Sequence, residues 1–145
     1  MKAPIYDESW PDDVKALYRH DMEEIWDRRI APQIWTSYHN QLDMYLAIAG
    51  NKPLSILDVG CAQGTLALLL AERGHRVTAL DLRPQFLTYA QSRQTHGEIE
   101  FRRVDVLTDP IPGRYDLVFA NQVIEHLVYP TRLCKRLFDV LLPGG

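Results

Sequence analysis

The chain has 145 residues, of which 46% are hydrophobic and 24% are charged, a size and composition that suit one globular domain. Its formal net charge of −3 argues against a broad surface for nucleic acid, so nucleic acid is not an expected partner. The two cysteines, Cys61 and Cys134, lack CxxC spacing, which suggests neither a zinc cluster nor a disulfide framework. No apolar run approaches the roughly 18 residues of a membrane span. We therefore expect a soluble, cytoplasmic protein with a small-molecule ligand.

The first 52 residues differ from the rest of the chain in composition, because they hold all three tryptophans, Trp10, Trp26 and Trp35. Apolar residues at helical spacing predict one helix that starts just after Pro11 and reaches Ile30. A second helix is predicted from Pro32, a favourable first helical residue, to Gly50, which stops it. We expect residues 1–52 to be a helical extension that acts as a lid.

From Pro53 onward the pattern alternates between strand and helix. Apolar runs predict strands at 54–59, 76–82, 99–106 and 115–120, and amphipathic segments predict helices at 65–73, 84–95 and 131–142. Strands that are joined by helical crossovers form a parallel sheet covered on both faces. Residues 53–145 are thus predicted to be an α/β domain.

A glycine-containing loop follows the first predicted strand, in the stretch SILDVGCAQG at residues 55–64. Such a loop is typical of a site for a dinucleotide, a phosphate or a nucleoside without phosphate. The dinucleotide fingerprint GxGxxG lacks its central glycine here, and the phosphate loop GxxxxGK[ST] lacks its lysine because Thr65 follows Gly64. The loop therefore matches neither the dinucleotide fingerprint nor the phosphate loop.

Acidic residues end the next two predicted strands. Asp81 lies 17 residues after Gly64, where a carboxylate can accept hydrogen bonds from both ribose hydroxyls. The alternative role of Asp81 is to cap the helix that starts at Pro84. Asp105 can accept from an adenine amine, while Leu82 and Val106 supply apolar faces for the ring. With no arginine or lysine clamp in these loops, the pattern predicts a nucleoside with a zwitterionic tail.

Five motifs, in order and spacing, resemble those of class I S-adenosylmethionine-dependent methyltransferases. They are DVGCAQG at 58–64, ALDL at 79–82, VDV at 104–106, YDLVFANQVIEHL at 115–127 and LLPGG at 141–145. The resemblance covers about residues 53–145. It implies a Rossmann-like parallel sheet with strand order 3-2-1-4, and S-adenosylmethionine as the cofactor.

The resemblance also implies roles for individual residues. The glycine loop (Gly60, Cys61, Gln63 and Gly64) would line the methionine moiety, and Asp58 would bind its amino group. Asp81 would bind the ribose, Leu82 would pack on the adenine, and Asp105 with Val106 would hold the adenine edge. Asn121 and Gln122 would face the sulfonium and its methyl group.

The segment from Gln122 to His126 bears on catalysis. It is similar to an E-x-x-E-H pattern of ubiquinone-pathway O-methyltransferases and small-RNA 2′-O-methyltransferases, where the side chains are associated with a divalent metal. Here Gln122 replaces the first glutamate and removes a charge, so no metal is predicted. His126 is the candidate base for a hydroxyl acceptor. The alternative is that Glu125 caps the next turn and His126 packs near the pocket mouth.

The acceptor is expected between this segment and the N-terminal helices, where Tyr38 and His39 are the candidate substrate residues; His39 as a solvated helix residue is the alternative. The predicted function is methyl transfer to a small molecule, with O-methylation favoured. The alternatives are a non-catalytic S-adenosylmethionine-binding module or fragment, and an RNA 2′-O-methyltransferase.

The chain stops on the LLPGG motif, whereas members of this family usually have seven strands. The fourth strand would then be an exposed apolar edge, which favours pairing with other chains. We hypothesise that the sequence is part of a longer protein, or that another chain covers the edge.

Overall fold

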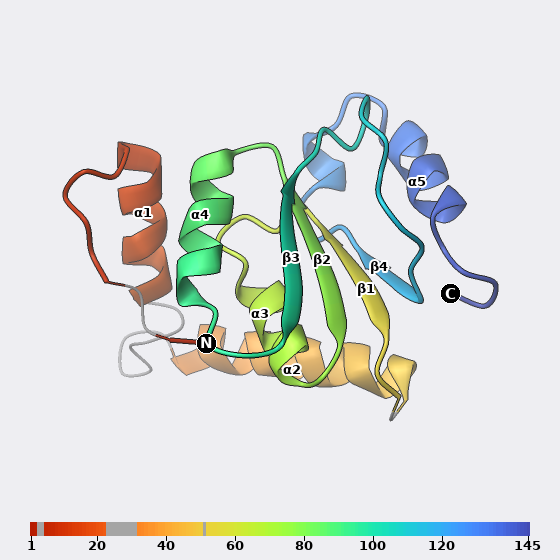
Figure 1. The fold of residues 1–145 in the computed structure, drawn as a ribbon, viewed down its shortest axis with the longest axis horizontal. Coiled ribbons are helices and arrows are strands. Elements are labelled where there is room, and N and C mark those ends of the chain that lie inside the picture. The colour runs from red at the N-terminus through yellow and green to blue at the C-terminus, as the bar shows by residue number, and fades with distance from the viewer. Residues whose placement is uncertain (3–4, 23–31, 51) are drawn as a thin grey trace.

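The computed structural model describes residues 1–2, 5–22, 32–50 and 52–145. A parallel sheet is surrounded by helices (Figure 1). The strands are β1 (Ser55–Val59), β2 (Arg76–Asp81), β3 (Glu98–Arg103) and β4 (Leu117–Phe119). The helices are α1 (Asp12–Asp21), α2 (Pro32–Ala49), α3 (Thr65–Glu72), α4 (Pro84–Arg93) and α5 (Pro130–Asp139), and a short 3₁₀ helix, η2, spans Ile124–His126.

The sheet has the strand order β3-β2-β1-β4, with every pair parallel, as the sequence predicts. In the register of the central strands, Asp58 of β1 pairs with Ala79 of β2 and with Phe119 of β4. Parallel pairing places the carboxyl ends of all the strands at one edge of the sheet. The loops that follow the strands, which carry the predicted site residues, therefore meet there.

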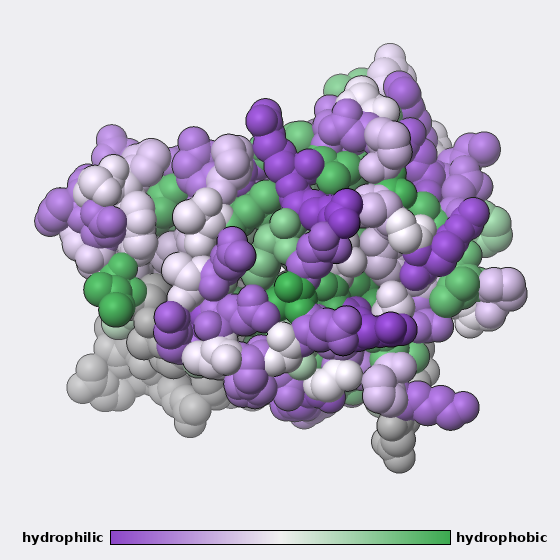
Figure 2. All heavy atoms as spheres, viewed as in Figure 1, coloured by the Kyte–Doolittle hydropathy of each residue, from purple (hydrophilic) through white to green (hydrophobic). Residues whose placement is uncertain are grey.

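The two faces of the sheet are covered by different helices because side chains alternate along each strand. Ile56 packs into a core with α2 and α3, whereas the next residue, Leu57, packs into a second core with α5. A third cluster joins α1 to α4 through Val14, Phe86 and Tyr89. Polar side chains cover most of the face seen in Figure 2, and apolar groups gather around its middle.

Several predicted element boundaries shift. The third strand ends at Arg103 instead of Val106, because Asp105 begins a turn in which its carboxylate accepts from the amide of Leu107 at 2.9 Å. The last helix ends at Asp139 instead of Leu142, because Leu141 forms a parallel bridge with Tyr115. Of the first predicted helix, residues 23–30 lie outside the described part of the chain.

The predicted exposed edge at β4 is partly covered. The bridge between Tyr115 and Leu141 pairs the backbone just before β4, with the amide of Leu142 donating to Tyr115 O at 2.8 Å. Phe119 is buried, and Leu117 and Val118 are half-buried. Within the described residues β4 is the last strand of the sheet and pairs only with β1, so its outer backbone edge stays unpaired while its side chains are largely packed against the cores.

Candidate functional site

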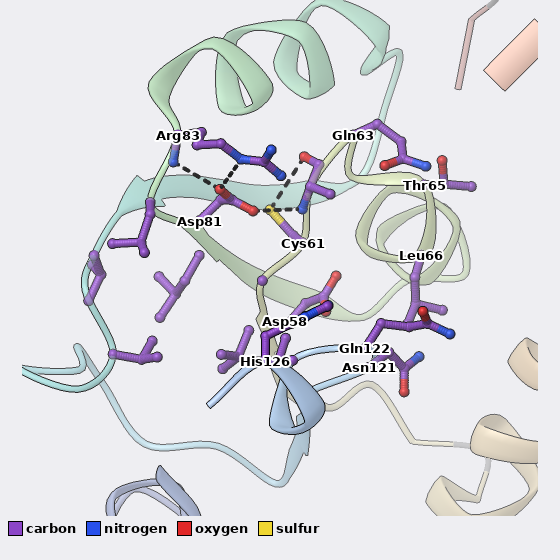
Figure 3. Close-up of a pocket in the computed structure, with 18 of the residues that line it drawn as sticks. Asp58, Cys61, Gln63, Thr65, Leu66, Asp81, Arg83, Asn121, Gln122 and His126 are labelled. Carbon is purple, nitrogen blue, oxygen red and sulfur yellow. Dashed lines mark hydrogen bonds and ion pairs between the residues drawn. The ribbon is translucent and has the colours of Figure 1, made fainter. Parts of the chain in front are cut away.

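A cavity of about 930 Å³ lies at the carboxyl ends of the strands, where the loops after β1, β2, β3 and β4 meet (Figure 3). It is lined by ten of the predicted cofactor residues, namely Asp58, Gly60, Cys61, Gln63, Asp81, Leu82, Asp105, Val106, Asn121 and Gln122. His126, the predicted base, also lines it. The structure thus brings together residues that are separated by almost 70 positions in the sequence.

The glycines of the loop after β1 are required by contacts within the protein. Gly60 has a φ of +70°, and a Cβ there would lie 2.5 Å from Cγ2 of Val123. Gly64 has a φ of +74°, and a Cβ there would lie 2.6 Å from the Cβ of Ala90 on α4. Gly64 faces α4 and does not appear among the described residues that line the cavity. The glycine pattern therefore reports close packing of the loop, in addition to any space for a ligand.

Backbone strain is concentrated at the same cavity. Among the described residues, Ala62 (φ +45°) and Gln122 (φ +55°) are the non-glycine residues with positive φ, and both line the cavity. Non-glycine residues rarely adopt this conformation unless the surrounding structure imposes it, and such residues cluster at functional sites.

Asp81 joins the end of β2 to the glycine loop. One carboxylate oxygen accepts from the amide of Ala62 at 3.0 Å, and the other accepts from the amide of Arg83 at 2.9 Å. The guanidinium of Arg83 also lies 3.7 Å from the carboxylate. The bond to Arg83 organises the turn before α4, whose first residue is Pro84; the N-cap residue of α4 is Arg83 itself, with no side-chain capping bond. The same carboxylate lines the cavity, and each of its oxygens has a further lone pair for a ligand hydroxyl.

Asp58 is a buried carboxylate that faces the cavity, with 4% of its surface exposed. Its burial, and secondly the nearby carboxylate of Asp81, raise the pKa of Asp58 to about 7. Within the described residues no hydrogen bond offsets these effects. A cationic group in the cavity would favour the ionised form of Asp58.

Cys61 is also buried at this point, and its burial, together with the Asp58 and Asp81 carboxylates, raises the pKa of its thiol. The thiol therefore stays protonated at neutral pH and is a weak nucleophile. Its position fits a packing role beside a ligand.

Asp105 lies where β3 gives way to a turn. One of its oxygens accepts from the amide of Leu107 at 2.9 Å, and its own amide donates to Asp109 at 2.9 Å. These bonds fix the orientation of the half-buried carboxylate beside Val106, and both residues line the cavity.

The loop after β4 supplies the opposite wall. In Figure 3, Asn121 and Gln122 lie next to each other on the other side of the cavity from Asp81, and His126 projects from η2. Asn121 is linked to α2, since its Oδ1 accepts from the hydroxyl of Tyr45 at 3.3 Å.

Two lining residues of the N-terminal helices, His20 of α1 and Gln41 of α2, were missed from the sequence. Nothing in the helical pattern distinguishes them from solvated polar residues. Of the predicted substrate residues, His39 is half-buried and is not among the described lining residues, whereas the side chain of Tyr38 lies outside the described part. Among the described residues, His20 and Gln41 form the wall from the N-terminal helices, and the substrate role of Tyr38 stays a prediction.

Within the described residues no group of three or more histidine, cysteine, aspartate and glutamate side chains could hold a metal ion. Glu125 is exposed and is not among the described residues that line the cavity. In addition, no described helix has the length and apolar character needed to cross a membrane.

The parallel sheet and the cavity beyond its carboxyl ends define a Rossmann-like α/β ligand-binding domain. A family model described as a methyltransferase domain matches residues 56–145, so the chain belongs to the methyltransferase domain family. The resemblance drawn from the sequence motifs is confirmed.

A similar curated protein is the ubiquinone biosynthesis O-methyltransferase of Pseudomonas entomophila, which is 31% identical over 110 residues. The match covers 73% of this chain and 46% of the relative, so the chain spans about half the length of the curated relatives it matches.

Solved methyltransferases share the fold. Magnesium protoporphyrin IX methyltransferase from Synechocystis PCC 6803, solved with bound SAH (S-adenosylhomocysteine), has a TM-score of 0.65 at 17% identity, covering 94% of this chain and 58% of that one. Coclaurine N-methyltransferase, bound to N-methylheliamine and SAH, has a TM-score of 0.70 at 24% identity, and the match covers 77% of this chain and 34% of that one. At sequence identities of 17% and 24%, these similarities show a shared fold and nothing more.

Proposed function

We propose that this chain binds S-adenosylmethionine and forms part of an enzyme that transfers the methyl group to a hydroxyl of a small molecule. The observation that carries the proposal is the convergence of Asp81, the glycine loop and the buried Asp58 on one cavity. Membership of the methyltransferase domain family supports it.

The charges and size of the cavity suit this cofactor. Asp58 offers a carboxylate to an ammonium group, and Asp81 offers one to a pair of hydroxyls. A cavity of about 930 Å³ is near the upper end of the usual range for small-molecule sites, which leaves room for the reacting part of an acceptor. In this proposal the loop at 60–64 holds the methionine portion, Asp81 the ribose, and Leu82, Asp105 and Val106 the adenine.

The acceptor would lie between the N-terminal helices and the loop after β4. Two residues on that side, Val123 and Leu127, are apolar. The polar ones are uncharged or weakly basic, namely His20, Gln41, Asn121, Gln122 and His126. Among the described lining residues the one arginine, Arg83, is beside Asp81 on the side proposed for the ribose, and there is no lysine. This composition favours an uncharged acceptor over a phosphorylated one.

The proposed chemistry is a direct displacement. The acceptor oxygen would attack the methyl carbon while the carbon–sulfur bond breaks and its electron pair stays on sulfur. S-adenosylmethionine supplies an already activated methyl group, so the protein must mainly align the acceptor and exclude water. The hydroxyl proton needs a base, for which His126 is proposed, with His20 as the second imidazole at the cavity.

A second candidate is a domain that binds S-adenosylmethionine without transferring its methyl group. Its support is that the chain spans 46% of the relative's length, so catalysis by this chain alone is a separate question from binding. The acidic net charge and the uncharged acceptor side disfavour the RNA alternative.

Calorimetry with S-adenosylmethionine, S-adenosylhomocysteine and NAD tests the binding proposal. We expect both adenosyl compounds to bind and NAD to bind more weakly or not at all; tighter binding of NAD would refute the proposal. Transfer from a labelled methyl donor to panels of phenols, aliphatic alcohols and amines then separates the enzyme from the binding domain. Transfer confined to amines would refute O-methylation.

A further inference from the structure

Arg93, the last residue of α4, is completely buried behind the glycine loop. Arginine is rarely so buried unless its charge is paired with polar groups. Its Nη1 donates to Gln63 O at 3.0 Å and to the hydroxyl of Thr65 at 3.2 Å. Both partners line the cavity, whereas Arg93 itself is not among the described lining residues. Arg93 therefore acts on the site from outside it.

The peptide between Gln63 and Gly64 is held at both of its polar groups. Its carbonyl accepts from Arg93, and its amide, from Gly64, donates to Cys61 O at 2.8 Å. A hydrogen bond from a buried guanidinium is stronger than one between neutral groups. The carbonyl is thereby turned toward α4, which fixes the path of the loop where it enters α3.

Helix α4 holds the loop at a second point one turn earlier. Ala90 packs against Gly64 so closely that a Cβ on the glycine would lie 2.6 Å from the Cβ of Ala90. Residues three apart on a helix share a face, so Ala90 and Arg93 act together. The aromatic ring of Tyr89 lies 5.6 Å from the guanidinium and further encloses the charge.

We propose that Arg93 is a positioning residue, which fixes the glycine loop for the amino-acid portion of S-adenosylmethionine. This inference rests on the proposed function. The ribose and adenine contacts should depend less on Arg93. Asp105 is anchored to the amide of Leu107, and one oxygen of Asp81 to the amide of Arg83. The other oxygen of Asp81 accepts from the amide of Ala62, which precedes the Gln63–Gly64 peptide that Arg93 holds. Loss of Arg93 should therefore lower the affinity for ligands that carry the amino-acid tail more than the affinity for ligands without it.

The test compares S-adenosylhomocysteine with 5′-methylthioadenosine, which has no amino-acid tail, by calorimetry on R93M, R93K and the wild type. In R93M we expect S-adenosylhomocysteine to bind about tenfold more weakly or worse, as for a lost charge-assisted hydrogen bond, while 5′-methylthioadenosine changes less than about twofold. R93K keeps the charge without the planar guanidinium and should show a smaller selective loss. Equal weakening of both ligands, or no weakening, would overturn the inference.

Two further variants allow the inference to be tested even if removal of the buried arginine prevents folding. Thr65→Val removes one acceptor of Arg93 and leaves the arginine in place. It should lower the affinity for S-adenosylhomocysteine a few-fold and leave that for 5′-methylthioadenosine less affected. The control is R102M, since Arg102 is exposed on β3 and pairs with Glu100 at 2.7 Å; it should bind both ligands like the wild type. A wild type that binds neither ligand would refute the proposed function, whereas normal wild-type binding with unselective variants would refute only the role of Arg93.

Discussion

The hydroxyl of Tyr45 donates to Oδ1 of Asn121 at 3.3 Å and so connects α2 with the cavity wall that follows β4. The ring of Tyr45 also packs on Phe119, with 4.4 Å between ring centroids. Phe119 is the last residue of β4, two positions before Asn121. One side chain of the N-terminal region therefore supports both the strand and the residue proposed to face the reacting methyl group.

Removing this hydroxyl should affect binding more than folding. In Y45F the ring still packs on Phe119, so we expect little change in Tm, with S-adenosylhomocysteine bound a few-fold more weakly because a hydrogen bond contributes about 0.5 to 1.5 kcal/mol. Y45A should in addition lower the free energy of unfolding by about 2 kcal/mol through lost packing. Calorimetry and thermal unfolding measure the two effects. Unchanged affinity in Y45F would show that Asn121 needs no support from α2.

Replacing Asp81 should strongly lower the affinity for the adenosyl ligands. We expect D81A to lower the affinity for S-adenosylmethionine by roughly 1 to 3 kcal/mol, because a charged acceptor for the ribose hydroxyls is lost. D139A is the control, since Asp139 is exposed on α5 and pairs with Lys135. If D81A bound as tightly as D139A in calorimetry, the ribose assignment would be wrong.

The pH dependence of binding should report Asp58. Its pKa is raised to about 7, so the carboxyl is largely neutral below that pH and ionised above it. Affinity for the cationic amino group of S-adenosylhomocysteine should therefore increase between about pH 6 and pH 8. D58N should bind weakly with a flat profile over this range. A wild-type profile as flat as that of D58N would contradict the contact.

Asp58 should also make stability depend on pH in the direction opposite to that of a salt-bridged carboxylate. Its pKa is near 3.8 when unfolded and about 7 when folded, so between these values the folded state binds more protons. The free energy of unfolding should consequently fall as pH rises from about 4 to about 7. Urea unfolding of the wild type and D58N at several pH values measures this component as their difference. If the difference in free energy of unfolding between the wild type and D58N did not vary with pH, Asp58 would not contribute to the pH dependence of stability.

Gly60 should tolerate no side chain. G60A would place a Cβ 2.5 Å from the side chain of Val123 at a φ of +70°. Gly50 is a matched control, since it has the same φ of +70° and a Cβ added there would meet no described residue within 4 Å. We expect G50A to lose about 1 to 2 kcal/mol of stability from the backbone conformation alone, and G60A to lose more, together with ligand affinity. Equal losses in unfolding experiments would mean that the loop adjusts without cost.

The sequence by itself determined the order of strands and helices and the family. Apolar runs and glycine or proline boundaries are local signals, and they predicted the parallel sheet within a few residues at most ends. The acids Asp81 and Asp105 could be assigned to one site because they come at the ends of predicted parallel strands, whose carboxyl ends meet by geometry, whereas Asp58 was assigned from the family resemblance.

Other features depend on contacts between distant segments, which leave no local pattern. Only the tertiary structure brought His20 and Gln41 to the cavity, because their position depends on how α1 and α2 pack on the sheet domain. It also showed that Gly60 and Gly64 are needed against Val123 and Ala90. The burial of Arg93 behind the loop was decided in the same way, since an arginine near a helix end is ordinarily solvated.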